Sequence, residues 1–213
     1  QKYFQLFGQF TAGVAVHYRP SKIVGEGNFQ NLAKGLVIGK RFHSAPVIRH
    51  ADAKPMQIGH CIIANGAWRV FAFAGNAEPM SDKCGVRKLA ERLSQDSSSP
   101  IKKYTPNGYE IDSIIDFRVV FQIHHRQLER NNLHPLLAPA KGQYGLNDFE
   151  KVFCVDHRPG KNIYDMRGIN KEDGCIIIVR PDQYISEIRT LNDFEGLAEF
   201  FSIVAIGLAG DPN

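Results

Sequence analysis

The sequence predicts an α/β domain in which a mixed sheet has flanking helices and is preceded by an irregular N-terminal arm. The first indication is residues 174–188, where an apolar strand, a turn at Pro181-Asp182 and a returning strand read as a hairpin. The second is the segment that follows, in which apolar residues recur at helical spacing. The third is a series of short apolar runs after residue 56, which are typical of buried strands.

The elements between residues 56 and 108 begin with a predicted hairpin. Cys61-Ile62-Ile63 and the segment 68–73 flank Asn65-Gly66, a dipeptide that readily takes the positive backbone angles of a type I′ turn. Ser81 is expected to cap a helix, whose apolar face comprises Val86, Leu89, Ala90 and Leu93. Residues 95–108 are rich in Ser, Pro and Lys, which predicts a surface loop.

The second half of the chain predicts two further strands and a closing helix. Residues 114–125 form a strand with one apolar face, made of Ile115, Phe117, Val119, Phe121 and Ile123. Residues 126–150 are expected to be a long irregular connection, and residues 151–156 another central strand. Asn192 and Glu195 have capping-box spacing, and the helix they open is expected to bury Phe194, Leu197, Ala198, Phe201 and Val204. A final hairpin followed by a helix is typical of a thioredoxin-like α/β domain.

Composition and charge exclude several classes of function. The net charge of +4 is mild and no basic run exceeds two residues, so nucleic acid is not an expected partner. No apolar stretch approaches the roughly 20 residues that span a bilayer, so no membrane segment is predicted. The 4 cysteines are widely spaced and form no CxxC pair, which favours a reducing, cytoplasmic location. Residues 1–7 look like the tail of an element already under way, which predicts a piece of a longer protein.

Several ordered segments resemble the C-terminal thioredoxin-like (dimerisation) domain of the FAD-dependent phenol 2-monooxygenase (phenol hydroxylase) family. The matching segments are Arg180-Pro181-Asp182-Gln183-Tyr184, residues 10–18 with Pro20-Ser21, Gly39-Lys40-Arg41 with Ala45-Pro46-Val47 and residues 51–55, residues 68–75, and Gly168-Ile169 before Gly174. The resemblance covers nearly the whole chain. It implies that residues 1–55 are a connector from a preceding flavoprotein body and that residues 56–213 are the thioredoxin-like domain.

The resemblance also implies that the catalytic sites and the dimer contacts lie in different domains. The FAD, the NADPH and the phenol-type substrate of the parent enzyme would belong to preceding domains, while this chain would be structural, non-catalytic by itself and part of a homodimer. The sequence contains no dinucleotide-binding GxGxxG loop between a strand and a helix, so we assign no catalytic, cofactor-binding or metal-binding residue. The residues expected to matter are packing ones: Trp68, Phe71, Phe117, Phe121, Phe153, Ile177, Tyr184 and Phe201.

Two other functions stay open. Cys84 lies near the start of a predicted helix, so the chain could be a stand-alone thiol enzyme of the thioredoxin superfamily with Cys84 as its nucleophile. Against this, positions 81 and 87 are Ser and Arg, so no second cysteine lies at the redox spacing. The chain could also be a protein-binding adaptor that docks through residues 1–55.

Three polar groups have simpler interpretations than a reaction centre. Adjacent histidines 124 and 125 on a strand should point to opposite faces, so with His134 they predict surface positions and no metal site. The neighbours Asp156, His157 and Arg158 predict a strand end and a turn. A charged cluster of Arg41, Arg49 and Asp52 in the connector is either a solvated face or, as a hypothesis, an element that docks through ion pairs.

Overall fold

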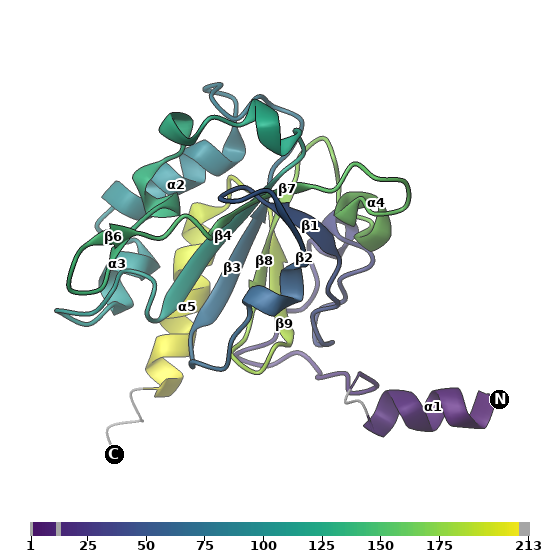
Figure 1. Cartoon of the computed structure of the whole chain (residues 1–213). Coiled ribbons are helices and arrows are strands. Elements are labelled where there is room, and N and C mark those ends of the chain that lie inside the picture. Colours follow the sequence, from purple (N-terminus) through teal and green to yellow (C-terminus); the bar gives the residue numbers. More distant parts are fainter. Residues whose placement is uncertain (1, 12–13, 209–213) are drawn as a thin grey trace, which may run out of the picture.

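The computed structural model of the chain describes residues 2–11 and 14–208 (Figure 1). Within these residues, seven strands form one sheet in the order β2-β1-β7-β4-β3-β8-β9. The strands are β1 (Pro46–Arg49), β2 (Lys54–Gln57), β3 (Trp68–Phe73), β4 (Ile115–Phe121), β7 (Val152–Val155), β8 (Cys175–Val179) and β9 (Ile185–Arg189), and β5 (Ala140–Lys141) pairs with β6 (Leu146–Asn147) in a separate ribbon. The helices are α1 (Lys2–Thr11), α2 (Gly85–Gln95), α3 (Pro100–Tyr104), α4 (Ile163–Arg167) and α5 (Phe194–Leu208).

The inner strands have the topology of a thioredoxin-like domain, which confirms the expected fold class. Strands β3 and β4 are parallel, as a crossover connection requires, and α2 lies in that connection. Strand β8 is antiparallel to β3 on its other side, and β9 returns along β8 before the chain enters α5. The predicted hairpin at residues 174–188 and its following helix are therefore both present.

The sheet is covered on both faces (Figure 1). Helices α2, α3 and α5 pack on one face, where Trp68, Val70 and Ala72 of β3 enter the core. Because successive strand residues point to opposite faces, Phe71 and Phe73 enter the core on the other face. There Phe42 stacks on Phe71 with ring centroids 5.1 Å apart. All eight of the packing residues expected from the sequence are buried: Trp68, Phe71, Phe117, Phe121, Phe153, Ile177, Tyr184 and Phe201.

Residues 24–42 form a segment that we call the strap, which runs beside β9 and covers part of the second face. The Gly25 N–H donates to the Ser186 carbonyl at 2.8 Å, and the Gly39 N–H donates to the Ile185 carbonyl at 2.8 Å. Buried strap residues belong to the core under that face: Val24, Leu32, Ala33, Leu36, Ile38 and Phe42. The boundary expected between residues 55 and 56 falls inside β2, and β1 and β2 belong to the main sheet.

The predicted hairpin around Asn65-Gly66 is wrong. Residues Ile58–Cys61 form a short 3-10 helix, and β3 pairs with β4 and β8 instead of with residues 61–63. The Asn65 side chain has another task, because its Oδ1 accepts hydrogen bonds from the Ala67 N–H at 3.2 Å and from Arg69 at 2.9 Å. The Asn65-Gly66 pair therefore belongs to a loop that accepts a hydrogen bond from the guanidinium of the buried Arg69.

Two helix starts also differ from expectation. Helix α2 begins at Gly85, and the Ser81 hydroxyl accepts from the Lys83 N–H at 3.1 Å instead of capping the helix. At α5 the Asp193 carboxylate, not Asn192, accepts from the Gly196 N–H at 3.1 Å. The apolar faces are nevertheless as predicted, apart from Ala198, which is only half-buried. The predicted loop 95–108 contains α3, whose Ile101 is anchored in the core.

Candidate functional site

An apolar hollow lies at the end of the sheet where β3 and β4 begin. The Trp68 N–H donates to the Ile114 carbonyl at 2.8 Å, which fixes the start of both strands. The Trp68 ring makes edge contacts with Phe200 and Phe201, at centroid distances of 5.7 and 5.8 Å. A hollow of about 330 Å³ opens beside them, which we call the α5 hollow; its lining residues are Trp68, Tyr104, Ile114, Ile115, Phe201, Val204 and Ala205.

A second apolar surface lies on α1, which stands away from the sheet (Figure 1). Tyr3, Phe7 and Phe10 are 70%, 53% and 70% exposed. Their spacing of four and three residues places them on one side of the helix. The centroids of the Tyr3 and Phe7 rings lie 4.4 Å apart, so the two rings contact each other along this stripe. An aromatic stripe of this kind is typical of a helix that packs on another protein surface.

Cys84 lies at the N-terminal boundary of α2, as predicted, but its side chain is only 2% exposed. A hollow of about 400 Å³ next to it, the α2 hollow, is lined by the carboxylate-bearing residues Glu78, Glu172 and Asp173 and one lysine, Lys83. A nucleotide diphosphate needs cationic groups or a glycine-rich cradle of backbone N–H groups. With three carboxylates against one lysine, the α2 hollow is electrostatically unfavourable for the diphosphate of FAD.

The other three cysteines, Cys61, Cys154 and Cys175, lie in surroundings that favour a packing role. All four thiols are free in the described residues. Burial raises the pKa of the Cys154 thiol to about 12, and burial also raises the pKa values of Cys61 and Cys175. The Cys61 thiol donates to the Ile58 carbonyl at 2.8 Å. Thiols whose ionised form is disfavoured in this way are poor nucleophiles.

A buried ionic network, which the sequence interpretation missed, lies where β3, β4 and β7 begin. The Asp116 carboxylate lies 3.0 Å from Arg69, 2.8 Å from Arg118 and 2.7 Å from Lys151. Lys151 also contacts Asp112. Burial alone would raise the pKa of Asp112, but Lys151 and Lys141 beside it hold that pKa below its ordinary value.

The available sequence signal for this network was the presence of charged residues inside apolar strands. Arg69 and Asp116 are register partners on neighbouring parallel strands, and both are almost fully buried. Because an unpaired buried charge is very unfavourable, a charge in a central strand predicts an opposite charge on a neighbouring strand. Arg69, Arg118 and Lys151 all form ion pairs with Asp116. Because these residues lie in or directly beside neighbouring strands, the ion pairs are suited to holding the strands in register.

The histidines do not form a metal centre within the described residues, where no group of three or more suitable ligands gathers. The expectation that His124 and His125 point apart is wrong, because β4 ends at Phe121 and both residues lie in the turn beyond it. Their rings are 4.3 Å apart, and the His124 ring stacks on His157 at 5.8 Å. His134 lies elsewhere and caps a 3-10 turn by accepting from the Leu136 N–H at 3.1 Å.

The sequence neighbours Asp156 and Arg158 form an ion pair at 2.5 Å, immediately after β7. This contact with Arg158 lowers the pKa of Asp156. With its carboxylate engaged there, Asp156 does not orient the His157 ring, which stacks on His124 instead. The interpretation as a strand end followed by a turn is therefore confirmed.

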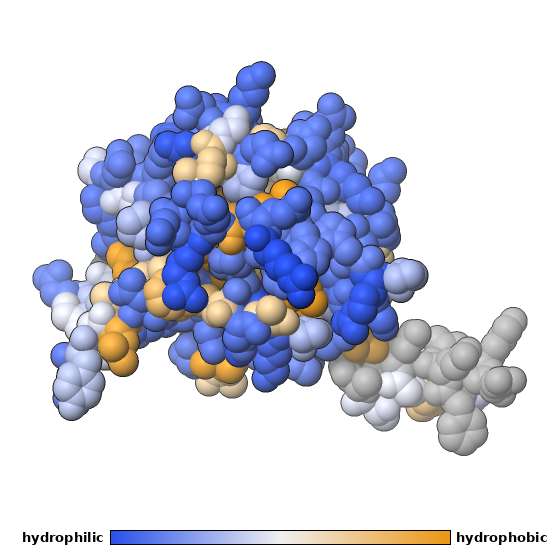
Figure 2. Space-filling model, turned by 45° about the horizontal axis from the view of Figure 1, so that its top comes forward, coloured by the Kyte–Doolittle hydropathy of each residue, from blue (hydrophilic) through white to orange (hydrophobic). Residues whose placement is uncertain are grey.

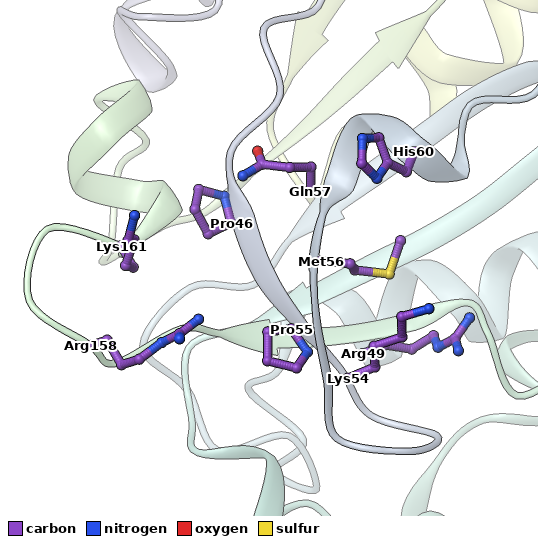
Figure 3. Close-up of a pocket in the computed structure, with 9 residues that line it drawn as sticks. All are labelled: Pro46, Arg49, Lys54, Pro55, Met56, Gln57, His60, Arg158 and Lys161. Carbon is purple, nitrogen blue, oxygen red and sulfur yellow. The ribbon is translucent and has the colours of Figure 1, made fainter.

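A basic hollow of about 510 Å³ lies on the outer edge strand β2, and we call it the β2 hollow (Figure 3). Its basic residues are Arg49, Lys54, His60, Arg158 and Lys161. Of the charged cluster expected from the sequence, Arg49 and Asp52 do meet, at 2.6 Å, and Arg49 also contacts Glu150 at 2.6 Å. Arg41 is not part of it, because its guanidinium donates to the Gln183 amide oxygen at 2.6 Å.

Hydrophilic side chains dominate the face of the molecule that Figure 2 shows. Hydrophobic residues appear there only as small separate spots. None of the helices that the structure describes is both long and apolar enough to cross a membrane. Apolar side chains gather at the α5 hollow and on α1, and the size of these two surfaces suits contacts with protein.

Comparison with known proteins decides the family. The model of the family described as "Phenol hydroxylase, C-terminal dimerisation domain" matches residues 16–207. The chain belongs to this family. It is 45% identical over 202 residues to the 3-hydroxybenzoate 4-monooxygenase of Comamonas testosteroni, covering 94% of this chain and 32% of that enzyme. It is 28% identical to the phenol 2-monooxygenase fsqG of Aspergillus fumigatus, covering 98% of this chain and 34% of that protein.

The chain thus spans about a third of the length of these curated relatives. Among solved structures, a putative protein disulfide isomerase from Bacteroides thetaiotaomicron superposes with a TM-score of 0.45 at 10% identity, covering 82% of this chain and 92% of that one. The family resemblance that the sequence motifs indicated is confirmed.

Proposed function

We propose that this chain is the C-terminal structural and dimerisation domain of a phenol 2-monooxygenase-like flavoprotein aromatic hydroxylase and is non-catalytic by itself. The observation that carries the proposal is the family match across residues 16–207. The structure is consistent with such a role, because both faces of the sheet are filled with side chains and the buried charges are paired with one another. On this proposal the domain contributes a stable folded body and a binding surface to the enzyme, and no catalytic group.

The N-terminal segment supports a connection to a preceding flavoprotein body. Helix α1 lies before residue 16, where the family match begins, and its aromatic stripe is exposed. We propose that Tyr3, Phe7 and Phe10 pack on that body, while the strap holds the connector to the sheet. In this arrangement residues 1–55 keep the connector role that the resemblance implies, although much of the segment also belongs to the domain core.

The parent enzyme would hydroxylate an aromatic ring of a phenol-type substrate with FAD, NADPH and oxygen. Three relatives are named as a 3-hydroxybenzoate 4-monooxygenase, an FAD-dependent monooxygenase and a phenol 2-monooxygenase. This chain spans about a third of the length of these relatives, so we place the flavin and its chemistry in the preceding domains. The partners of this chain are then that body and a second subunit.

The test is to measure flavin and NADPH chemistry with the purified chain. We expect no stoichiometric FAD after incubation and desalting, and no FAD-dependent oxidation of NADPH. We also expect light scattering to report a dimer. Bound FAD in a one-to-one ratio would contradict the assignment of flavin chemistry to other domains, and a chain that stays monomeric would contradict its dimerisation role.

One observation favours a second candidate, a thiol enzyme that uses Cys84, because this residue lies at the start of the helix that follows the first strand of the thioredoxin-like core. Its burial and the carboxylates of the α2 hollow argue for a packing role instead. A Cys84→Ala variant separates the two functions. Loss of a peroxide-reducing activity in this variant would establish the thiol enzyme, whereas a wild-type chain with no such activity would eliminate it.

A further inference from the structure

We infer that four basic side chains at the end of the strap form a binding site for a phosphate group. We call this group the strap cation site, and its members are Lys40, Arg41, His43 and Arg167. The proposed dimerisation function gives these residues no task. Their partial burial, their lack of carboxylate partners within the described residues and the donors that they present support this assignment.

Partly buried cations elsewhere in the described chain are paired with carboxylates. Each of the other arginines and lysines that the structure describes as partly or fully buried forms an ion pair, as Arg189 does with Asp193 at 2.6 Å. Lys40, Arg41 and Arg167 are also partly buried, but they form no ion pair with a described carboxylate. Because burying a cation without an anion beside it is unfavourable, three such cations together indicate an anion from outside the described chain.

Two segments of the chain hold the site together. The Gly35 N–H of the strap donates to the Arg167 carbonyl at 2.8 Å, which fixes the last turn of α4 against the strap (Figure 1). A Cβ at residue 35 would lie 2.8 Å from that carbonyl oxygen, so this close approach requires glycine. The Arg167 guanidinium in turn donates to the Ser44 carbonyl, directly beside His43. The end of α4 and the end of the strap therefore present their basic groups to one place.

The electrostatics of the site agree with this placement. Burial lowers the pKa of His43, and the nearby charges of Arg167, Lys40 and Arg41 lower it further. Burial also lowers the pKa of Arg167, and no neighbouring carboxylate raises it. The four groups therefore share one positive potential that the described chain leaves uncompensated, and an anion that enters it gains from all of them.

The donors of the site suit a phosphate group. Arg167 Nε is buried and has no hydrogen-bond partner among the described residues. The Arg41 guanidinium donates to Gln183 Oε1 at 2.6 Å and has further N–H groups to offer. An arginine fork matches both carboxylate and phosphate. A phosphate carries about two negative charges and three acceptor oxygens, so it can engage cations from both segments at once, which a single carboxylate does less well.

The β2 hollow is less suited to this role, although it also gathers basic residues. Its Arg49 and Arg158 already contact carboxylates, in the second case Asp156 at 2.5 Å. Its Lys54 and Lys161 are exposed, so water solvates them and an anion beside them adds little. Lys161 is useful for this reason, because it is a matched control cation that forms no ion pair with a described residue.

The first experiment measures the binding of inorganic phosphate to the full chain by calorimetry, with chloride holding the ionic strength constant. We expect saturable binding, and we expect Arg167→Gln to raise the dissociation constant at least about tenfold, the effect of losing one charged hydrogen bond. Glutamine keeps an N–H donor at this position, which favours retention of the fold. Arg41→Gln should act in the same direction, whereas Lys161→Gln should leave the dissociation constant unchanged.

The imidazole of His43 gives a second readout, which needs no variant that could unfold. A bound phosphate adds negative charge beside the ring, so it should raise the pKa of His43. The measurement follows the ring proton signals against pH by NMR, in phosphate and in chloride of equal ionic strength. His43→Gln identifies the signal among the 8 histidines. Arg167→Gln should remove the phosphate-dependent part of the shift.

Two further probes test the chemistry and the source of the ligand. Adenosine 5′-monophosphate that binds more tightly than inorganic phosphate would indicate a phosphate ester, and equal or weaker binding would indicate free phosphate. Acetate, the carboxylate probe, should bind more weakly than either. Acetate that binds as tightly as phosphate would instead assign the site to a carboxylate and overturn the inference.

The remaining outcomes also decide. Phosphate binding that does not saturate, that neither arginine variant weakens or that Lys161→Gln weakens equally would overturn the phosphate site. If Arg167→Gln unfolds, Arg41→Gln and the His43 titration of the wild type decide in its place. Each of these results leaves the proposed dimerisation standing, because light scattering tests it separately.

Discussion

The guanidinium of Arg69 lies 3.0 Å from the carboxylate of Asp116, across a pair of parallel strands in which the two residues are register partners. Lys151 of the neighbouring segment reaches the same carboxylate, and its side chain is also almost fully buried. One carboxylate therefore contacts two buried cations from two directions. Removing it leaves two buried positive charges with fewer partners, which is far more costly than removing an exposed ion pair.

We therefore predict that Asp116→Asn, which keeps the shape of the side chain, lowers the free energy of unfolding by about 3–5 kcal/mol. The measurement is urea denaturation followed by circular dichroism. Asp52→Asn is the matched control, because Asp52 is half-exposed in its pair with Arg49 and its loss should cost less than about 1 kcal/mol. An equal fall in the free energy of unfolding in the two variants would show that burial does not make the Asp116 ion pairs more stabilising than an exposed pair.

Gly174 gives a second prediction, concerning the entry to β8. Its φ is +67°, and a Cβ at this position would lie 2.1 Å from the Phe73 carbonyl oxygen. Gly174→Ala should therefore lower the free energy of unfolding by at least about 2 kcal/mol. Gly66→Ala is the comparison, since Gly66 also has a positive φ, +78°, but has open space around it and should cost about 1 kcal/mol. Similar unfolding curves for the two variants would refute the steric argument.

A third prediction concerns pH. Burial lowers the pKa of His50, and the nearby Arg130 lowers it further. In the unfolded chain a histidine titrates at about 6.5, so as the pH falls the unfolded state binds the proton first. The free energy of unfolding should therefore be complete above about pH 7 and decrease as the pH falls through 6.5 towards the folded-state pKa.

The slope from this histidine is at most about 1.4 kcal/mol per pH unit. The measurement is urea denaturation between pH 7.5 and pH 5.5, and the variant His50→Gln should flatten the dependence. A steeper loss of stability in His50→Gln would contradict the prediction.

The fourth prediction concerns the aromatic stripe of α1. Because Phe7 and Phe10 are 53% and 70% exposed, the double variant Phe7→Ser/Phe10→Ser should change the free energy of unfolding by no more than about 0.5 kcal/mol. The same variant should bind less of a hydrophobic fluorescent dye. A large fall in the melting temperature would instead mean that α1 packs on this domain rather than on a preceding one.

The parts of the fold that were predictable are those that depend on apolar periodicity. The β8–β9 hairpin, the β4 face and the apolar faces of α2 and α5 all follow from residue spacing, and the structure confirms them. The hairpin around Asn65-Gly66 was wrong because β3 satisfies its backbone with β4 and β8, which lie far away in the sequence. The hydrogen bonds that β3 makes with these distant strands outweigh the local preference of Asn-Gly for a hairpin turn.

The candidate surface was less predictable than the fold. Family motifs indicated a dimer, but no sequence pattern showed that Trp68, Tyr104 and Ala205 border one hollow, because they come from three separate elements. The same applies to the strap, whose glycine-punctuated sequence looked like a loose arm. Its buried residues recur without a helix or strand period, so its place in the core depends on contacts with β9.

The contact between the strap and β9 has a consequence for synthesis on the ribosome. The Gly25 N–H donates to the Ser186 carbonyl, so residue 25 cannot reach its final position until residue 186 has been made. A preceding domain would complete its own folding first, since domains fold as units from the N-terminus during translation. Translation that stops before residue 185 would leave the strap without its edge strand, and such products should be recognised and degraded as incomplete.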